Sequence, residues 1–345
     1  MTDSLDIKSL TSPDWLLAGF DAEKDRYHLA KVSRETYRAS SFLDHRIQPL
    51  PTETLSITGQ QLDKVLQHVS GPPASWIFHT GFCCSTLLAS CLDHPGSTLV
   101  LREPKVLSLL AHAARKNTVS SSFVQQRVIG MCERSYPGEA LVIKPSNFAN
   151  SLMGGLMFAE HHERQRKTVL MSSSLESLLI SILKKRAEAE ASLPAFLNAL
   201  LQDSDYLQVT GISNPGQLHL LQQSVLFWHC QRRFLQQRLA EAAEGSFMSL
   251  SMERFLAQPQ AVLAETSEFF NLGLAQKLIQ ETVETGAFGR HSKQTGKDYN
   301  PETHRMEQAA TKALFATEIE QAMNWAEPLL EQLPIKPFDK FEASN

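Results

Sequence analysis

The chain has 345 residues, 42% of them hydrophobic, and a formal net charge of −4. This composition suits one large or two modest globular domains with a sizeable core. The near balance of acids and bases offers no polybasic surface for nucleic acid or an anionic membrane. No stretch approaches the ~20 apolar residues of a membrane span. The N-terminus lacks the apolar core of a signal peptide, and the 5 cysteines are irregularly spaced. We therefore expect a cytoplasmic protein.

Residues 1–70 are predicted to form an N-terminal extension that packs on a main domain at residues 71–345. Within the extension, residues 16–32 have the pattern of a β-hairpin, and residues 56–69 have that of a helix. A Gly-Pro-Pro run follows this helix and separates the extension from the main domain.

A series of short apolar runs begins after this break. Each run is too short for a helix and is apolar throughout, which is typical of strands buried on both faces of a parallel sheet. The runs are residues 75–78, 97–101, 140–143, 167–171 and 246–252.

Helical patterns alternate with these strands, at residues 85–94, 104–116, 175–191 and 216–245. This alternation predicts an α/β fold in which a central parallel sheet lies between two layers of helices. Ligands of such folds bind beyond the carboxyl ends of the strands. The segments that follow each strand therefore hold the candidate site residues.

The first strand leads into a tight turn and a helix in the sequence WIFHTGFCCSTLLASCLDH, residues 76–94. The free N–H groups at such a helix start favour an anion, and Ser85 and Thr86 add hydroxyl donors. The turn is not a Walker A motif, because Thr86 stands where the second glycine belongs and no lysine follows. This argues against hydrolysis of ATP or GTP. The alternative to an anion-binding turn is a strand–turn–helix connection in which the cysteines are only packing residues. Thiols at a helix start are also prone to oxidation, which would make ligand binding redox-sensitive.

Charged residues follow the second and third strands as well. Glu103 lies beside Arg102 and Lys105, where it could act as a general base near an anion, or could simply cap the next helix. Lys144 ends the third strand, where it could neutralise a transferred group or remain a solvated loop residue. Their occurrence at neighbouring strand ends favours a common site over three unrelated loops.

Over residues 75–330, the order of these elements resembles the sulfotransferase superfamily, whose fold is a P-loop-type α/β sheet. The resemblance rests on the following segments: FHTGFCCSTLLASCLD, LREP, VIKPSN, TVLMSSSLESLLISILKK, the helix around Trp228, SLSMERFLAQPQAVLAETSEFFNLGL and GRHSKQTGKDY. It implies an enzyme that transfers a sulfuryl group from 3′-phosphoadenosine-5′-phosphosulfate (PAPS) to a hydroxyl or amine. The acceptor would be a small molecule or glycan, and no metal is expected, because a sulfuryl group carries less negative charge than a terminal phosphoryl group.

The resemblance also implies roles for individual residues. Glu103 would take the acceptor's proton, and Lys144 or Arg102 would balance the charge that develops on the bridging oxygen. The first loop would hold the 5′-phosphate, and the late loop would close over the nucleotide. The implied donor-binding residues are Thr80, Gly81, Phe82, Cys83, Cys84, Ser85, Thr86, Ser173, Ser181, Arg290, His291, Ser292 and Lys293.

The chain departs from the family pattern at two cationic positions. Phe82 stands where the family has a lysine or arginine, and Ser173 stands where it has the arginine of the 3′-phosphate site. Lys144, Lys184 and the basic residues of the late loop are the candidates to replace them. Two alternatives therefore stay open: a degenerate nucleotide-binding or interaction protein without catalytic activity, and a phosphotransferase that has lost its Walker lysine.

Overall fold

The chain folds into two compact units that interleave along the sequence. Unit 1 comprises Met1–Ile77, Thr86–Thr168 and Leu263–Ile279, and unit 2 comprises Phe78–Ser85, Val169–Val262 and Gln280–Asn345. The computed structural model describes residues 6–116, 122–157, 166–241, 243–284, 288 and 301–343. Within these ranges every helix is too short or too polar to serve as a membrane span.

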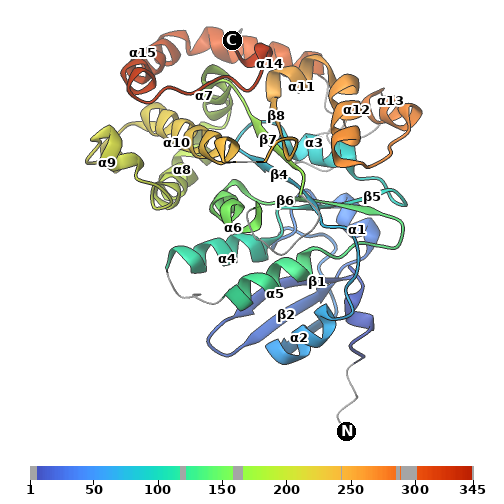
Figure 1. Cartoon of the computed structure of the whole chain (residues 1–345). Coiled ribbons are helices and arrows are strands. Elements are labelled where there is room, and N and C mark those ends of the chain that lie inside the picture. The colour runs from blue at the N-terminus through green and yellow to red at the C-terminus, as the bar shows by residue number, and fades with distance from the viewer. Residues whose placement is uncertain are drawn as a thin grey trace. The chain divides into compact units, whose positions relative to one another are not determined.

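A five-stranded sheet with the strand order β5-β6-β4-β7-β8 forms the centre of the fold and is flanked by helices (Figure 1). Its strands are β4 (Ser75–His79), β5 (Thr98–Arg102), β6 (Ala140–Lys144), β7 (Thr168–Ser172) and β8 (Phe247–Ser251). β6 pairs in parallel with both β4 and β5, and this register sets Arg102 beside Lys144. The predicted α/β class and all the predicted strands of the sheet are confirmed.

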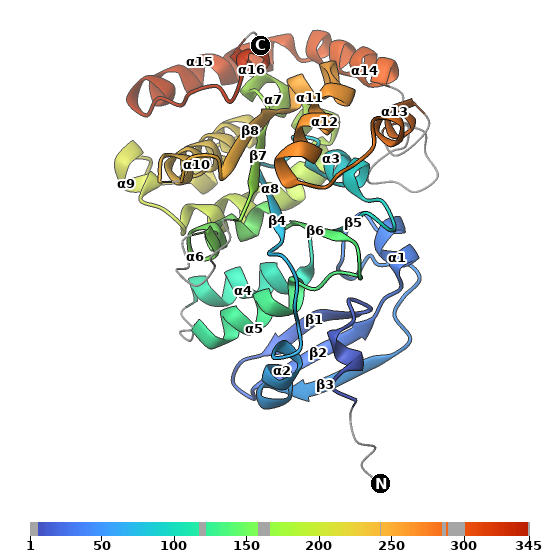
Figure 2. The ribbon, with the colours of Figure 1, turned by 45° about the vertical axis from the view of Figure 1, so that its right-hand side comes forward.

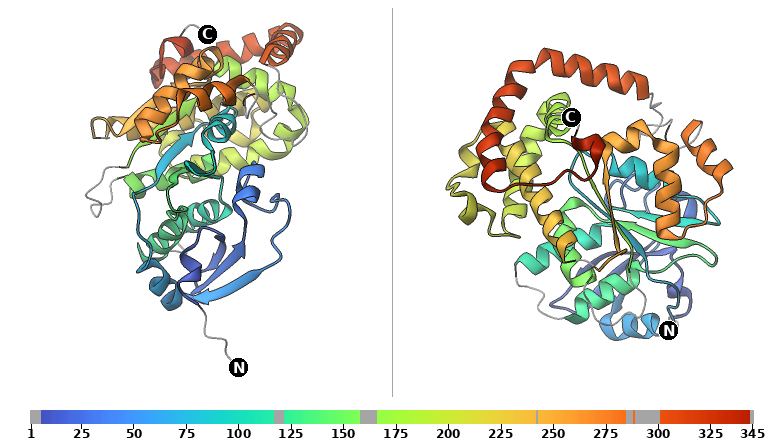
Figure 3. Two further views of the ribbon diagram at one scale, coloured as in Figure 1. Left: turned by 90° about the vertical axis from the view of Figure 1, so that its right-hand side faces the viewer. Right: turned by 45° about the horizontal axis from the view of Figure 1, so that its top comes forward.

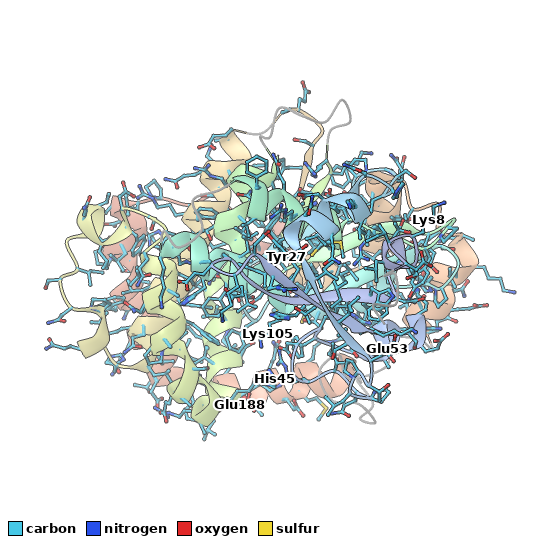
Figure 4. The ribbon with its side chains drawn as sticks, turned by 90° about the horizontal axis from the view of Figure 1, so that it is seen from below. Lys8, Tyr27, His45, Glu53, Lys105 and Glu188 are labelled. Carbon is cyan, nitrogen blue, oxygen red and sulfur yellow. The ribbon has the colours of Figure 1, made fainter. Side chains whose placement is uncertain are left out.

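The early part of unit 1 is a separate antiparallel sheet of order β1-β2-β3, with a hairpin between its first two strands. Its strands are β1 (Trp15–Asp21), β2 (Arg26–Lys31) and β3 (Thr54–Thr58). Tyr27, labelled in Figure 4, is buried on β2. Helices α4 (Lys105–Arg115) and α5 (Ser122–Cys132) pack against β1 (Figure 2).

Capping residues explain where the short helices of this region begin. Ser33 caps α1 (Arg34–Ala39) by accepting the N–H of Thr36. Thr58 and Gln61 form a reciprocal capping box at the start of α2 (Gly59–Leu66). Side chains that satisfy the first free N–H groups in this way stabilise a helix start by about 1 kcal/mol.

A buried charge network ties α1 to the central strands of unit 1. The Arg34 guanidinium donates to Asp93 Oδ1 at 2.7 Å and to Glu139 Oε2 at 2.9 Å. Arg102 donates to the other oxygen of Asp93 at 3.1 Å. Asp93 is 3% exposed and Arg102 is 3% exposed, so these charges rely on one another rather than on water.

The core of unit 2 is a group of helices packed through leucine-rich faces. These helices are α7 (Leu175–Lys184), α8 (Arg186–Leu201), α9 (Tyr206–Thr210), α10 (Leu220–Ala240) and α15 (Ala316–Gln332). The prediction of one helix over residues 175–191 is wrong, because Lys185 leaves helical geometry at φ −124° and separates α7 from α8. Most of residues 184–215 lie in α8 and α9.

The remaining helices complete the two units. α14 (Pro301–Leu314) and α15 are separated only by Phe315, where the chain bends sharply (Figure 3). The others are α3 (Ser85–Leu92), α6 (Met153–Met157), α11 (Met252–Ala257), α12 (Pro259–Phe270), α13 (Gln276–Glu284) and α16 (Lys340–Ala343), with single 3-10 turns at Ser9–Thr11, Asn147–Leu152 and Pro215–Gln217.

A buried histidine on α10 links three parts of unit 2. His229 Nδ1 accepts the Tyr206 hydroxyl at 2.7 Å, and its Nε2–H donates to Leu333 O at 2.8 Å. Since a carbonyl only accepts, Nε2 carries a proton, and the burial that lowers the pKa of the ring favours its neutral form. Burial is the main factor that lowers the pKa of His229 below its usual 6.5.

The lowered pKa of His229 predicts a pH-dependent stability. The stabilisation is present above pH ~6.5, and it is lost as the pH falls through the lower pKa of the folded state. The free energy of unfolding falls over this range by at most about 1.4 kcal/mol for each pH unit, because one proton is taken up on unfolding. We expect His229→Gln, which cannot titrate, to lose less stability than the wild type between pH 7.5 and 5.5 in urea denaturation.

The quantity compared is the difference in the free energy of unfolding between the wild type and His229→Gln at each pH. Burial raises the pKa of Glu342 to about 7, so stability from this residue is lost as the pH rises from its ordinary 4.5 toward 7. That opposite contribution is common to both proteins and cancels in the difference. Equal pH slopes for the two proteins would contradict a role for His229.

Candidate functional site

The turn after β4 has the backbone geometry of an anion cradle. Phe82 and Cys84 have positive φ values of 61° and 60°, whereas Cys83 between them does not. Alternation of this kind turns successive N–H groups toward a common point, where they can hold an anion. Because a side chain at positive φ is strained, the turn keeps this shape at an energetic cost of order 1–3 kcal/mol per residue. This cost favours a functional loop over a plain joint.

Contacts with β7 hold the turn in place within unit 2. The Thr80 N–H donates to Met171 O at 3.0 Å, and its hydroxyl lies 3.3 Å from Ser172 Oγ. The Cys83 thiol is buried and donates to Thr80 O at 3.0 Å, and this contact stabilises the turn. Cys84 is only partly buried. The adjacent cysteines therefore have different roles, one internal and one at the face of the turn.

The segment after β7 forms a second polar site in unit 2. Ser174 caps α7, and its own N–H donates to Glu253 Oε1 at 2.9 Å. Ser173 is fully buried, and its hydroxyl has no hydrogen-bond partner among the described residues. The Ser181 hydroxyl donates back to Ser177 O within the helix. A carboxylate of the chain itself thus occupies the start of α7, where the resemblance implies the 3′-phosphate.

Glu253 is a site residue that sequence reasoning did not single out. It lies in the first turn of α11, after β8, and it is 79 residues from Ser174 along the chain. Its Oε2 atom is buried and has no hydrogen-bond partner among the described residues. The acidic residue was visible after the last strand, but nothing in the sequence shows that it reaches the start of α7.

Glu103 and Lys144 form an ion pair at the ends of β5 and β6 in unit 1. Lys144 Nζ donates to Glu103 Oε1 at 2.5 Å. The lysine is fully buried, while the glutamate side chain is 17% exposed. Glu103 has a φ of +50°, and its N–H donates to Lys144 O. A carboxylate held against a buried cation, on strained backbone and open to solvent at one side, is suited to proton transfer.

Arg102 lies away from this pair, in the interior of unit 1. Its guanidinium contacts Asp93, the Ser90 hydroxyl and the carbonyl oxygens of Tyr37 and Arg38. Glu103 lies just past the end of β5, and its left-handed backbone turns the chain there. These contacts give Arg102 a structural role, and Lys144 is the cation that contacts Glu103.

The other candidate cations lie elsewhere or outside the described residues. Lys184 pairs with Glu307 of α14 at 2.7 Å in unit 2. Arg290, His291, Ser292 and Lys293 lie outside the described residues. In the described part of the chain, no group of three or more His, Cys, Asp or Glu side chains is arranged to hold a metal ion.

Comparisons with known proteins give similarity in structure alone. No protein-family model matches the chain, and no curated protein matches its sequence. The sulfotransferase domain from the curacin biosynthetic pathway covers 72% of this chain and 99% of its own, with 14% identity and a TM-score of 0.39. The sulfotransferase domain of the Synechococcus PCC 7002 olefin synthase covers 72% and 96%, with 13% identity and a TM-score of 0.39.

A third similar structure is the sulfotransferase from Alicyclobacillus acidocaldarius, with 14% identity, coverage of 73% of this chain and 97% of that one, and a TM-score of 0.38. All three share little sequence with this chain. The chain is thus similar in structure to sulfotransferase domains over most of its length, at low sequence identity.

Proposed function

We propose that the chain is a sulfotransferase that moves a sulfuryl group from PAPS to a hydroxyl or amine acceptor without a metal. The observation that carries the proposal is the Glu103–Lys144 pair, in which a partly exposed carboxylate on left-handed backbone contacts a fully buried lysine. A purely structural ion pair needs neither the strained backbone nor the opening to solvent.

Glu103 is assigned the role of general base. As the acceptor oxygen attacks sulfur, its proton passes to the Glu103 carboxylate, and a new S–O bond forms. The bond between sulfur and the bridging oxygen of the 5′-phosphate breaks in the same in-line displacement. Lys144 then offsets the negative charge in this region, because its ammonium is fixed in a dry environment where such an interaction is strong.

The donor phosphates are assigned to the polar segments of unit 2. The N–H groups of the turn at Phe82 to Cys84 suit the 5′-phosphate, for which they need no lysine. The buried hydroxyl of Ser173, which has no hydrogen-bond partner among the described residues, is assigned to a polar group of the nucleotide at this end of β7. The chemistry of these donors fits an anionic nucleotide, and the assignment of the 3′-phosphate to Ser173 and Ser181 is part of the proposal.

Thermal unfolding with a panel of nucleotides tests the donor. A ligand present at 100 times its Kd stabilises the folded state by about 2.7 kcal/mol. We expect adenosine 3′,5′-bisphosphate (PAP) and PAPS to raise the Tm, and ATP with Mg²⁺ to leave it unchanged. AMP is the matched control, since it lacks only the 3′-phosphate of PAP. A shift with ATP and Mg²⁺ alone would instead support a phosphotransferase.

One observation favours a second candidate, a nucleotide-binding or interaction protein without transferase activity. Glu253 Oε1 already accepts the first N–H of the α7 cap, so a 3′-phosphate would meet a carboxylate there. Equal shifts with PAP and AMP, with no turnover, would favour this candidate.

A further inference from the structure

The N-terminal segment at residues 40–47 crosses the end of β5 directly over Glu103. The N–H of Leu43 donates to Arg102 O at 2.8 Å, and Leu43 O accepts the N–H of Lys105 at 3.0 Å. One residue thus bonds to the backbone on both sides of the candidate base. Ser40 and Ile47 are buried at the two ends of the crossing, and Leu43 is buried at its middle.

Arg46 is held in one orientation on this segment. Its Nε donates to Asp44 Oδ1 at 2.9 Å and its Nη2 donates to Asp44 Oδ2 at 2.5 Å, a two-pronged contact. The guanidinium also stacks on Phe42, 3.6 Å from the ring centroid. The side chain nevertheless stays 48% exposed. Exposed arginine side chains usually move freely. Because Arg46 is already held in one orientation, a ligand that binds it would cost little further side-chain entropy.

Arg46 lies within electrostatic reach of Glu103. The hydrogen bond that Arg46 donates to Asp44 is the first cause of the raised pKa of Arg46, and the charges of Asp44 and Glu103 add to it. Asp44 uses one edge of the guanidinium. Among the described residues, the Nη1 group of Arg46 donates no hydrogen bond. Its N–H donors are therefore available at the exposed side of the guanidinium.

Two further basic residues lie on or beside this crossing. His45 is exposed, and Lys105 is exposed at the start of α4. Both are labelled in Figure 4, where they are drawn in the same part of the view, as the bond between Lys105 and Leu43 requires. Lys144 is paired with Glu103 and Arg46 is paired with Asp44, and Lys105 adds a positive charge beside this crossing.

We propose that Arg46 binds an anionic group, a carboxylate or a phosphate, on the same acceptor whose hydroxyl Glu103 deprotonates. The acceptor class is thus a hydroxy acid or hydroxy phosphate. The inference rests on the proposed function, because it assigns the acceptor of that same reaction. Arg46 is a specificity residue in this scheme, and it takes no part in the transfer of the proton.

Matched acceptor pairs test the assignment. Each pair has the same hydroxyl with and without the charge: 4-hydroxyphenylacetate against its amide, glucuronate against glucuronamide, and glucose 6-phosphate against 6-deoxyglucose. We expect the wild type to have a higher kcat/KM for at least one anionic member, by roughly tenfold, as charge-assisted bidentate contacts do. Arg46→Gln should remove this preference, and Arg46→Lys should keep part of it.

The neutral member of each pair is the internal control. Its kcat/KM should change by less than about twofold in Arg46→Gln, because the neutral acceptor makes no charge-assisted contact with Arg46. Arg26→Gln, at an exposed arginine on β2, is the control variant. An equal loss for charged and neutral members would mean that Arg46 only supports the fold, and an unchanged preference would mean that it does not bind the acceptor. Either result overturns the proposal.

Binding measured without the donor separates this inference from the proposed function. The Kd of each anionic compound is measured by ligand-observed NMR for the wild type and for Arg46→Gln. If no acceptor is turned over but the wild type binds an anionic compound about tenfold more tightly than the variant, the transferase proposal fails and the Arg46 site stands. If turnover occurs and Kd does not depend on Arg46, the transferase proposal stands and this one fails. Absence of both turnover and binding overturns both.

Discussion

We expect Glu103→Gln to lower the rate of sulfuryl transfer by about 10²–10⁴-fold, as the loss of a general base does. PAP should still raise the Tm of this variant as it does for the wild type. The amide keeps the size of the side chain and can still accept a hydrogen bond from Lys144. It cannot take a proton. The measurement is the rate of transfer from PAPS to any acceptor that the wild type uses, together with thermal unfolding in the presence of PAP.

Glu133→Gln is the matched control for this variant. Glu133 also pairs with a largely buried cation in unit 1, Arg166, at 3.0 Å, and its side chain is 13% exposed. Loss of that pair should lower stability and leave the rate unchanged. If Glu103→Gln lowered the Tm as Glu133→Gln does and kept its activity, the role of Glu103 would be structural.

Asp93→Asn is expected to have the largest effect on stability. Asp93 accepts from two buried arginines, one at each carboxylate oxygen. The amide would take the shared counter-charge from both guanidinium groups, and Arg102, which is 3% exposed, could not be hydrated in exchange, whereas Arg34 would keep its contact with Glu139. Breaking a buried ion pair in this way costs about 3–5 kcal/mol. Urea denaturation followed by tryptophan fluorescence measures the loss.

Asp63→Asn provides the comparison at the surface. Asp63 pairs with Arg127 at 2.6 Å, but its side chain is 47% exposed. Water can replace the lost charge there, so the expected cost is below about 1 kcal/mol. Equal costs for the two variants would show that the Asp93 network does not carry the connection between α1 and the central strands.

The strands of the central sheet could be predicted because each is a short apolar run that ends at a polar residue. The strand ends likewise revealed Glu103 and Lys144 as neighbours, since the parallel register sets Arg102 beside Lys144. The sequence could not predict which of the charged side chains after β5 would contact Lys144. Arg102 and Glu103 are adjacent in sequence, and only the left-handed backbone at Glu103 shows which of the two meets Lys144.

The helices of unit 2 were harder to predict for a different reason. α8 contains Pro194 and follows α7 without a turn signal, so a pattern based on spacing cannot separate the two. The contact between Glu253 and the start of α7 depends on packing across many residues of chain. Long-range contacts of this kind leave no local signal in one sequence.

The crossing at Leu43 joins the N-terminal segment and the end of β5 into one cooperative opening unit. Leu43 takes part in two backbone hydrogen bonds, as the donor to Arg102 O and as the acceptor from the Lys105 N–H. Because both bonds hold this one residue, we expect them to open together. The two N–H groups are therefore released by a single local unfolding event. We expect this opening to loosen the backbone on both sides of Glu103, so the geometry of the candidate base depends in part on a segment some 60 residues earlier in the chain.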